Sequence, residues 1–201
     1  MPKLSILIPT HNRPDLFHRC LHSALDTHFD IEVIVNNDSN DIREIKDERV
    51  SYHYRKFEHL SQVYEFLLGY AKGEYVYFLE DDDYLSKDFY EKILLREDVI
   101  VGNYMPCHDL ENQLDYSMMY MNSVLPSEYF EEKMDTKRLQ LGQFIFKRDT
   151  IWDWDFPKDS HINNDELLVR YALKKTDLVR TMNRVFYHQT QDGGDNISFP
   201  E

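Results

Sequence analysis

The sequence has very few cysteines and no long apolar run. Cys20 and Cys107 are the only cysteines among 201 residues, and their spacing fits neither a metal-ligand pattern nor a disulfide framework. No apolar run reaches the roughly 20 residues that a membrane-crossing helix needs, and the apolar run near the N-terminus is too short for a secretory signal. We therefore expect a protein of a reducing, cytoplasmic compartment, without a transmembrane segment.

Internal repeats, low-complexity tracts and Gly/Ser linkers are also lacking. The hydrophobic fraction of 42% is ordinary for a globular protein, and the length suits one sizeable core. The net charge of −14 argues against a protein whose whole surface binds nucleic acid. Together these features predict a single domain over residues 1–201.

The first hundred residues alternate between apolar strands and amphipathic helices. We expect strands over 4–9, 31–35, 51–55 and 75–79, and helices over 13–25 and 60–71. This order predicts an α/β fold of Rossmann-like type, in which helices flank a mostly parallel sheet with right-handed crossovers. The second half is less regular, with strands expected over 99–104, 142–148 and 178–188 and a helix over 166–174.

Polar clusters directly follow three of the predicted strands. They occupy positions 9–13, 36–41 and 80–83. In open sheets of this type, ligands bind beyond the carboxyl ends of the strands. We therefore expect the three clusters to lie side by side along one edge of the sheet and to form the binding site.

The third cluster consists of four consecutive carboxylates, at positions 80–83. Their mutual repulsion is costly unless a cation or solvent relieves it. Carboxylate oxygens at a strand end suit a hard divalent ion that leaves positions open for phosphate oxygens, and such an ion would neutralise a diphosphate leaving group. An acidic loop, or an N-cap at Asp83 or Ser86 for a helix over 86–95, is the alternative interpretation.

These blocks resemble glycosyltransferase family 2, whose members have the GT-A fold of the nucleotide-diphospho-sugar transferases. The resembling segments, in chain order, are SILIPTHNR (5–13), VIVNNDSND (33–41), AKGEYVYFLEDDDYL (71–85), GQFIFKRDTIWD (142–153), DELLVRYAL (165–173) and DNIS (195–198). The resemblance implies one GT-A domain, with a nucleotide-sugar-binding half over 1–105 and a smaller acceptor-side half over 106–201. The implied reaction is a metal-dependent, inverting transfer of a sugar from a nucleotide diphosphate to an acceptor hydroxyl. UDP is the nucleotide diphosphate that the resemblance favours.

The same resemblance assigns roles to individual residues. The residues implied to bind the nucleotide-sugar donor are Pro9, Thr10, His11, Asn12, Arg13, Asn36, Asn37, Asp38 and Asp81. Asp82, Asp83 and His188 are the implied contacts of a Mn²⁺ or Mg²⁺ ion, with a strand histidine of no special role as the alternative for His188. Asp165, with Glu166 second, is the implied base that removes the acceptor proton.

The chain departs from the family's pattern at several positions. Asn36 and Asn37 stand where the family commonly has acids that bind uracil or ribose, although an amide can also pair with a base edge. Tyr64 aligns with the arginine of an Arg-Asn pair. The family's Glu-Asp pair aligns with positions 163–164, so that a shift of one residue makes Asp165 the base; otherwise the base is missing.

Two other functions stay open. A nucleotidyltransferase also uses an α/β sheet and a carboxylate-held metal, but usually carries a Gly-rich phosphate loop after the first strand, and PTHNRPDL has no glycine. A degenerate transferase fold that serves as a sugar- or protein-binding module is the non-catalytic alternative.

The acceptor is the least constrained partner. We expect a soluble acceptor, either a saccharide or a protein hydroxyl. Five cations against one acid between positions 167 and 191 also allow an anionic acceptor, such as modified nucleic acid. A charged surface without a binding role is the simpler interpretation of that segment.

Overall fold

The strands and helices follow one another in an α/β order over the residues that the structure, a computed structural model, describes: 1–39, 44–91, 93–106, 122–136, 139–155 and 164–190. The strands are β1 (Leu4–Thr10), β2 (Ile31–Asn37), β3 (Val50–His53), β4 (Tyr75–Phe78), β5 (Tyr84–Leu85), β6 (Val99–Pro106), β7 (Ser123–Pro126), β8 (Phe144–Lys147) and β9 (Leu178–Gln189). The helices are α1 (Pro14–Leu25), α2 (Leu60–Tyr70), α3 (Ser127–Thr136), the 3₁₀ turn η1 (Leu141–Gln143), α4 (Arg148–Ile151) and α5 (Asn164–Lys174).

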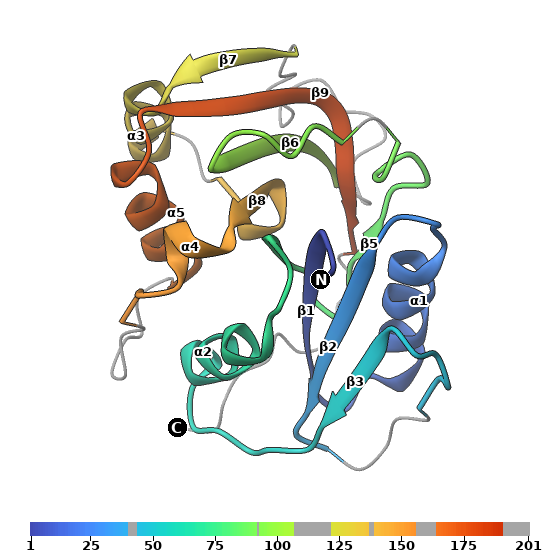
Figure 1. The fold of residues 1–201 in the computed structure, drawn as a ribbon. Helices are drawn as coiled ribbons and strands as arrows, with labels where there is room; N and C mark the ends of the chain where they lie inside the picture. Colours follow the sequence, from blue (N-terminus) through green and yellow to red (C-terminus); the bar gives the residue numbers. More distant parts are fainter. Residues whose placement is uncertain (40–43, 92, 107–121, 137–138, 156–163, 191–201) are drawn as a thin grey trace.

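All described strands belong to one sheet, in the order β3-β2-β1-β4-β8-β6-β9-β5, with β7 paired to β9 beside this path (Figure 1). Strands β1 to β4 run parallel to their neighbours, and β8 joins β4 in the antiparallel direction. The prediction of an α/β sheet with flanking helices is confirmed. The division into halves at residue 105 stays a prediction.

The sheet is covered on both faces, which explains why its central strands are apolar throughout. Every residue of β1 is buried. One core cluster packs α2, α3 and α5 against one face, and the other packs α1 and the segment around Phe89 against the opposite face (Figure 1). Among the described residues, no helix combines the length and the apolar character needed to cross a membrane.

The helix expected over 86–95 is wrong, because turns replace it in the described part of this range. The Phe89 amide donates to the Ser86 carbonyl at 2.9 Å, and the Phe89 ring is fully buried. The neighbouring Tyr90 hydroxyl donates to the Ala24 carbonyl at 2.5 Å. Two consecutive aromatic side chains with separate anchors hold the backbone off a helical path. Helix capping therefore does not explain the acidic cluster.

Gly102 in β6 offers a test of the packing between β6 and β9. A Cβ atom there would lie 2.4 Å from the Phe186 ring, which is itself fully buried. We expect Gly102→Ala to lower the free energy of unfolding by about 1–3 kcal/mol, the usual cost of overpacking a core. Urea unfolding of the purified variant measures this loss.

Gly69 provides the matched control, because a Cβ atom there would meet nothing within 4 Å. Gly69 lies inside α2, where alanine is favoured over glycine by about 1 kcal/mol. Gly69→Ala should therefore keep or raise the stability. Equal urea midpoints for the two variants would show that the Phe186 ring moves aside without a loss of stability, which would contradict the prediction.

Candidate functional site

The three polar clusters meet at the carboxyl ends of the parallel strands, as the sequence predicts. In the strand register Pro9 is opposite Asn36 and Thr10 is opposite Asn37. The backbone of β4 continues beside β1, since the Leu79 amide donates to the carbonyl of Leu7 at 3.0 Å. The turn at 80–83 therefore follows directly beside the first cluster.

Within the first cluster, His11 is held in one orientation. Its Nδ1 is hydrogen-bonded to the carboxylate of Asp38, and its Nε2 lies 2.8 Å from the Asn12 amide nitrogen. A carboxylate can only accept, so Nδ1 carries the proton and Nε2 accepts from Asn12. Asn12 has a φ of 51°, in the left-handed region that asparagine tolerates best among residues other than glycine. The ring is thereby fixed through its two edge nitrogens. A ligand can therefore stack on its faces.

The two asparagines at the end of β2 have different environments. The Asn36 amide bonds the backbone of Arg55 twice, as donor to the carbonyl at 3.0 Å and as acceptor from the amide at 3.2 Å. The Asn37 side-chain oxygen accepts from the amide and the hydroxyl of Ser39, at 3.0 and 2.7 Å. Asn36 therefore ties the end of β2 to the segment after β3, whereas Asn37 shapes the loop after β2. Pro9, Thr10, His11, Asn36 and Asp38, with Leu60 and Val63 of α2, line a small hollow there.

The acidic turn places two carboxylates inside the protein. The turn closes through a bond of 3.1 Å from the Asp83 amide to the Glu80 carbonyl. Asp81 is 0% exposed and accepts from the His11 amide at 3.3 Å, whereas Asp83 accepts from the Thr190 amide at 3.0 Å. Burial raises the pKa of Asp81 to about 6, and burial together with the neighbouring Asp82 raises the pKa of Asp83 to about 8.

Asp82 differs from its neighbours because its side chain is 32% exposed. Its carboxylate accepts from the Arg13 guanidinium at 2.7 Å, and the same guanidinium lies 3.5 Å from Asp81. A second arginine, Arg19, donates to the main-chain carbonyl of Asp82 at 2.7 Å and to the Thr190 hydroxyl at 2.6 Å. Two cations of α1 and its N-terminal cap thus lie against the acidic turn.

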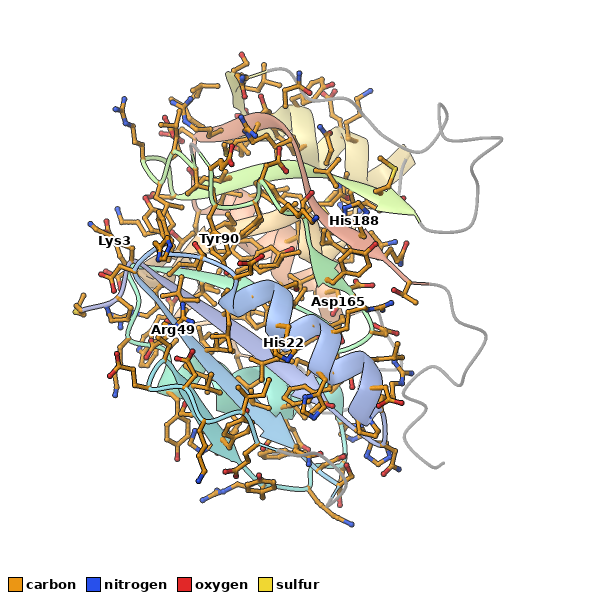
Figure 2. All side chains as sticks on the ribbon, turned by 90° about the vertical axis from the view of Figure 1, so that its right-hand side faces the viewer. Lys3, His22, Arg49, Tyr90, Asp165 and His188 are labelled. Carbon is orange, nitrogen blue, oxygen red and sulfur yellow. The ribbon has the colours of Figure 1, made fainter. Side chains whose placement is uncertain are left out.

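Asp165, at the start of α5, belongs to the same site. Glu80 accepts a hydrogen bond from the buried hydroxyl of Tyr64. Burial first, and then the charge of Asp165, raise the pKa of Glu80 well above its ordinary value. Asp165 therefore lies close enough to the acidic turn to act on it, and Figure 2 shows Asp165 toward the end of the molecule opposite Lys3. Glu166 instead pairs with Arg170 along α5, at 2.8 Å.

His188 does not join the acidic residues. It lies on β9 opposite Tyr84, and the two rings stack with centroids 4.7 Å apart. It lines a hollow of about 620 Å³ that residues of α1 and of the segment 84–88 complete, including His22 (Figure 2). Burial lowers the pKa of His188. The described residues contain no group of three or more His, Cys, Asp or Glu side chains arranged for a metal ion. The contact of His188 with an ion stays a prediction.

The acidic turn nevertheless fits a divalent ion that a substrate helps to hold. Mg²⁺ and similar ions are usually bound through one or two carboxylates plus substrate phosphates, so three protein ligands are not required. Asp82 is the accessible carboxylate, and two buried carboxylates with raised pKa values lie beside it. The guanidinium of Arg13 already lies between Asp81 and Asp82, which shows that this position attracts a cation.

The sequence did not predict the contacts of several residues of the site. Tyr64 and Glu80 connect α2 and β4 to Asp165, and Arg19 and Thr190 secure the acidic turn from α1 and from the end of β9. The departure from the family at Tyr64 was the available signal for the first pair. The DNIS segment lies outside the described residues.

The cations between 167 and 191 are largely neutralised by acids. The ion pairs join Arg170 to Glu166, Lys175 to Asp153, Arg180 to Glu97 and Arg184 to Asp88. The segment therefore does not present a row of uncompensated positive charge. An anionic acceptor gains no support from these contacts and stays an untested prediction.

Comparison with known proteins agrees with this α/β fold and its acidic strand-end site. The model of the family "glycosyl transferase family 2" matches residues 5–151. GlyA, a glycosyltransferase of Streptococcus pneumoniae serotype 4, is 27% identical over 148 residues, which are 66% of this chain and 20% of GlyA. The GalNAc(5)-diNAcBac-PP-undecaprenol beta-1,3-glucosyltransferase of Campylobacter jejuni is 25% identical over 212 residues, which are 96% of this chain and 67% of that protein.

Solved structures show the same fold. Residues 1-349 of S. aureus TarS in complex with UDP-GlcNAc superimpose with a TM-score of 0.73 at 19% identity, covering 96% of this chain and 60% of TarS 1-349. The complex of the same TarS fragment with UDP gives a TM-score of 0.72. The chain belongs to glycosyl transferase family 2, and its GT-A fold is confirmed. It spans about a fifth of the length of GlyA and 60% of the TarS fragment.

The contact between Tyr64 and Glu80 yields a testable prediction. Removing the hydroxyl leaves the partly buried Glu80 carboxyl without this donor, and an unsatisfied buried group costs about 1–3 kcal/mol. We expect Tyr64→Phe to lower the free energy of unfolding by that amount in denaturant titrations. Tyr70→Phe is the control, because Tyr70 is an exposed residue of the same helix. Equal losses in the two variants would contradict a special role for the Tyr64 hydroxyl.

Proposed function

We propose that this protein transfers a sugar from a UDP-linked donor to an acceptor hydroxyl with inversion, assisted by a divalent ion. One observation carries the proposal: three polar strand ends and the start of α5 converge on the carboxyl edge of the parallel sheet. Crevices at this edge are where open α/β sheets bind nucleotides. Membership of glycosyl transferase family 2 and the solved complexes of TarS with UDP and UDP-GlcNAc support the choice of donor.

In this proposal the nucleotide lies over the ends of β1 and β2. The edge-bonded ring of His11 suits stacking against a base, because Asp38 and Asn12 fix its orientation before the ligand arrives. The Asn36 side chain is occupied by the Arg55 backbone, so the position where the family commonly has an acid does not select the base here. The hollow beside α2 supplies the remaining contacts.

Asp165 is the proposed catalytic base. An inverting transfer needs one carboxylate that takes the acceptor proton as the hydroxyl attacks the anomeric carbon. Asp165 lies within electrostatic reach of Glu80 and Tyr64, and therefore beside the acidic turn. Glu166 pairs with Arg170 instead, which makes it the weaker candidate. A one-residue shift from the family's pattern thus gives Asp165 the role.

Asp82 is the proposed protein ligand of the divalent ion, with Asp81 and Asp83 as the charges behind it. When bound, such an ion supplies neutralisation of the leaving diphosphate. Asp82 combines an accessible carboxylate with a position between two buried acids. His188 lies in the separate hollow near α1 and is not included in this set.

For the acceptor we propose a saccharide hydroxyl. The name of the C. jejuni relative specifies a glucosyltransferase and a glycan on undecaprenol diphosphate, whereas the sequence of this chain favours a soluble acceptor. The rates of transfer from the same donor to oligosaccharides with and without a lipid diphosphate distinguish a lipid-linked acceptor from a soluble one. The pairing of the cations in 170–184 with acids gives no reason to prefer an anionic polymer.

The deciding experiment measures binding and hydrolysis of a panel of nucleotide sugars with Mn²⁺, with Mg²⁺ and with EDTA. We expect UDP and one UDP-sugar to raise the melting temperature only when the ion is present, since a ligand of the folded state stabilises it by mass action. We also expect slow hydrolysis of that UDP-sugar. Metal-independent binding of a free saccharide without nucleotide binding would instead support the sugar-binding module.

A further inference from the structure

Arg13 holds the position that a metal ion would have to approach. Its Nη1 lies 2.7 Å from Oδ2 of Asp82 and 3.5 Å from Oδ1 of Asp81. The Arg13 side chain is only 15% exposed, so water screens this contact poorly. The accessible carboxylate of the acidic turn is therefore already paired with a cation of the protein.

A guanidinium and a divalent ion compete at this carboxylate. Two cations at contact distance of one carboxylate repel each other, so the ion binds more tightly when the guanidinium moves away. The Arg13 backbone is fixed, because its carbonyl accepts from the Phe17 amide at 2.9 Å in the first turn of α1. Movement is therefore left to the side chain.

The released guanidinium has a clear alternative partner. A planar guanidinium binds phosphate oxygens in pairs, and does so better than an ammonium group. The diphosphate brought in by the donor would carry negative charge to the ion at Asp82. Arg13 can thus exchange one anionic partner for another without leaving the site.

We propose that Arg13 is a resident counter-ion of the acidic turn, which a divalent ion displaces from Asp82 as the donor binds, and which then binds the donor's phosphates. The inference rests on the proposed function, because it requires a nucleotide diphosphate as ligand. It gives Arg13 two opposite effects: the side chain weakens the binding of the ion alone and strengthens the binding of the nucleotide.

Arg19 is the appropriate control for the loss of charge. It also lies against the acidic turn, but it donates to the main-chain carbonyl of Asp82 and to the Thr190 hydroxyl. Its guanidinium is further placed over the Tyr84 ring, 4.9 Å from the ring centroid. Arg19→Gln therefore removes one positive charge beside the site without freeing a carboxylate.

The test compares Arg13→Gln, Arg13→Lys and Arg19→Gln with the wild type in two assays. Electron paramagnetic resonance of free Mn²⁺ reports binding of the ion to the protein alone, and calorimetry reports UDP binding at saturating Mn²⁺. We expect Arg13→Gln to bind Mn²⁺ about fivefold more tightly and UDP about tenfold more weakly, magnitudes typical of one charge-assisted contact. Arg13→Lys should keep the Mn²⁺ affinity of the wild type and lose part of the UDP affinity.

Arg19→Gln should change the Mn²⁺ affinity less than Arg13→Gln does. Mn²⁺ binding by Arg13→Gln that is unchanged or weaker overturns the counter-ion role, even where the wild type binds UDP with Mn²⁺. A wild type that binds no UDP with Mn²⁺ overturns the proposed function and this inference with it. Circular dichroism establishes that each variant is folded, and Arg13→Lys preserves the charge beside Asp81 if the Gln variant does not fold.

Discussion

Asp165→Asn is expected to reduce sugar transfer by about 10² to 10⁴ while UDP binding stays within a few-fold of the wild type. The amide keeps the size of the side chain and cannot take the acceptor proton. Asp165 lies at the start of α5, whereas the proposal assigns the nucleotide to the ends of β1 and β2. Turnover with saturating donor and acceptor, beside calorimetry with UDP, separates the two effects.

Glu166→Gln is the matched control, one residue further along the same helix turn. Glu166 is tied to Arg170 at 2.8 Å, and its loss should cost only a surface pair, about 0.5 kcal/mol of stability. We expect its turnover to stay within a few-fold of the wild type. If Glu166→Gln loses turnover and Asp165→Asn does not, Glu166 is the base, one position later than proposed. If neither variant loses turnover, another group acts as the base, whereas a wild type without any turnover would favour the binding module.

The first half of the fold could be predicted from the sequence because its signals are local. The run in β1 is apolar at nearly every position, since the strand is buried on both faces. The apolar positions of α1 recur at helical spacing. Of the residues that the pattern selects, Leu16, Phe17, Cys20, Leu21 and Ala24, all except Leu16 are buried. The carboxyl edge as the ligand site followed from the strand order alone.

Several other elements depend on contacts that the sequence does not express locally. Strand β5 is two residues long and exists only because Tyr84 and Leu85 pair with β9. Strand β7 is mostly exposed and likewise forms on β9. The helix expected over 86–95 failed for the same reason: a helical pattern yielded to aromatic anchors in the core.

The acidic turn was recognisable, whereas the internal partners of its carboxylates were not. Runs of acids after a buried strand indicate a cation site, and the structure does place Arg13 against Asp82. The link from Tyr64 to Glu80 joins residues 16 positions apart on different elements. The resemblance groups His188 with the acids, and the structure pairs His188 with Tyr84 in the hollow near α1. The order of the elements along the chain therefore predicted at which edge of the sheet the site lies. It did not predict which side chains are in contact there.

Asp82→Asn is expected to remove ion-dependent UDP binding. The substitution takes away the carboxylate that the proposal assigns to the ion, while the buried Asp81 and Asp83 keep their amide donors from His11 and Thr190. Because Asp82 is 32% exposed, its loss should leave the melting temperature of the free protein within about 3 °C of the wild type. A loss of UDP binding in this variant can therefore not be attributed to unfolding.

The measurement is the rise in melting temperature on adding UDP and Mn²⁺ at about 100 times the wild-type Kd. Such a concentration stabilises the folded wild type by about 2.7 kcal/mol, which corresponds to about 5–10 °C for a chain of this size. Asp82→Asn should show almost none of this rise. Asp98→Asn is the control, since Asp98 is also ion-paired, to Lys147 at 3.1 Å, beside the start of β6. A full rise in Asp82→Asn with Mn²⁺ present would transfer the role of metal ligand to a different carboxylate.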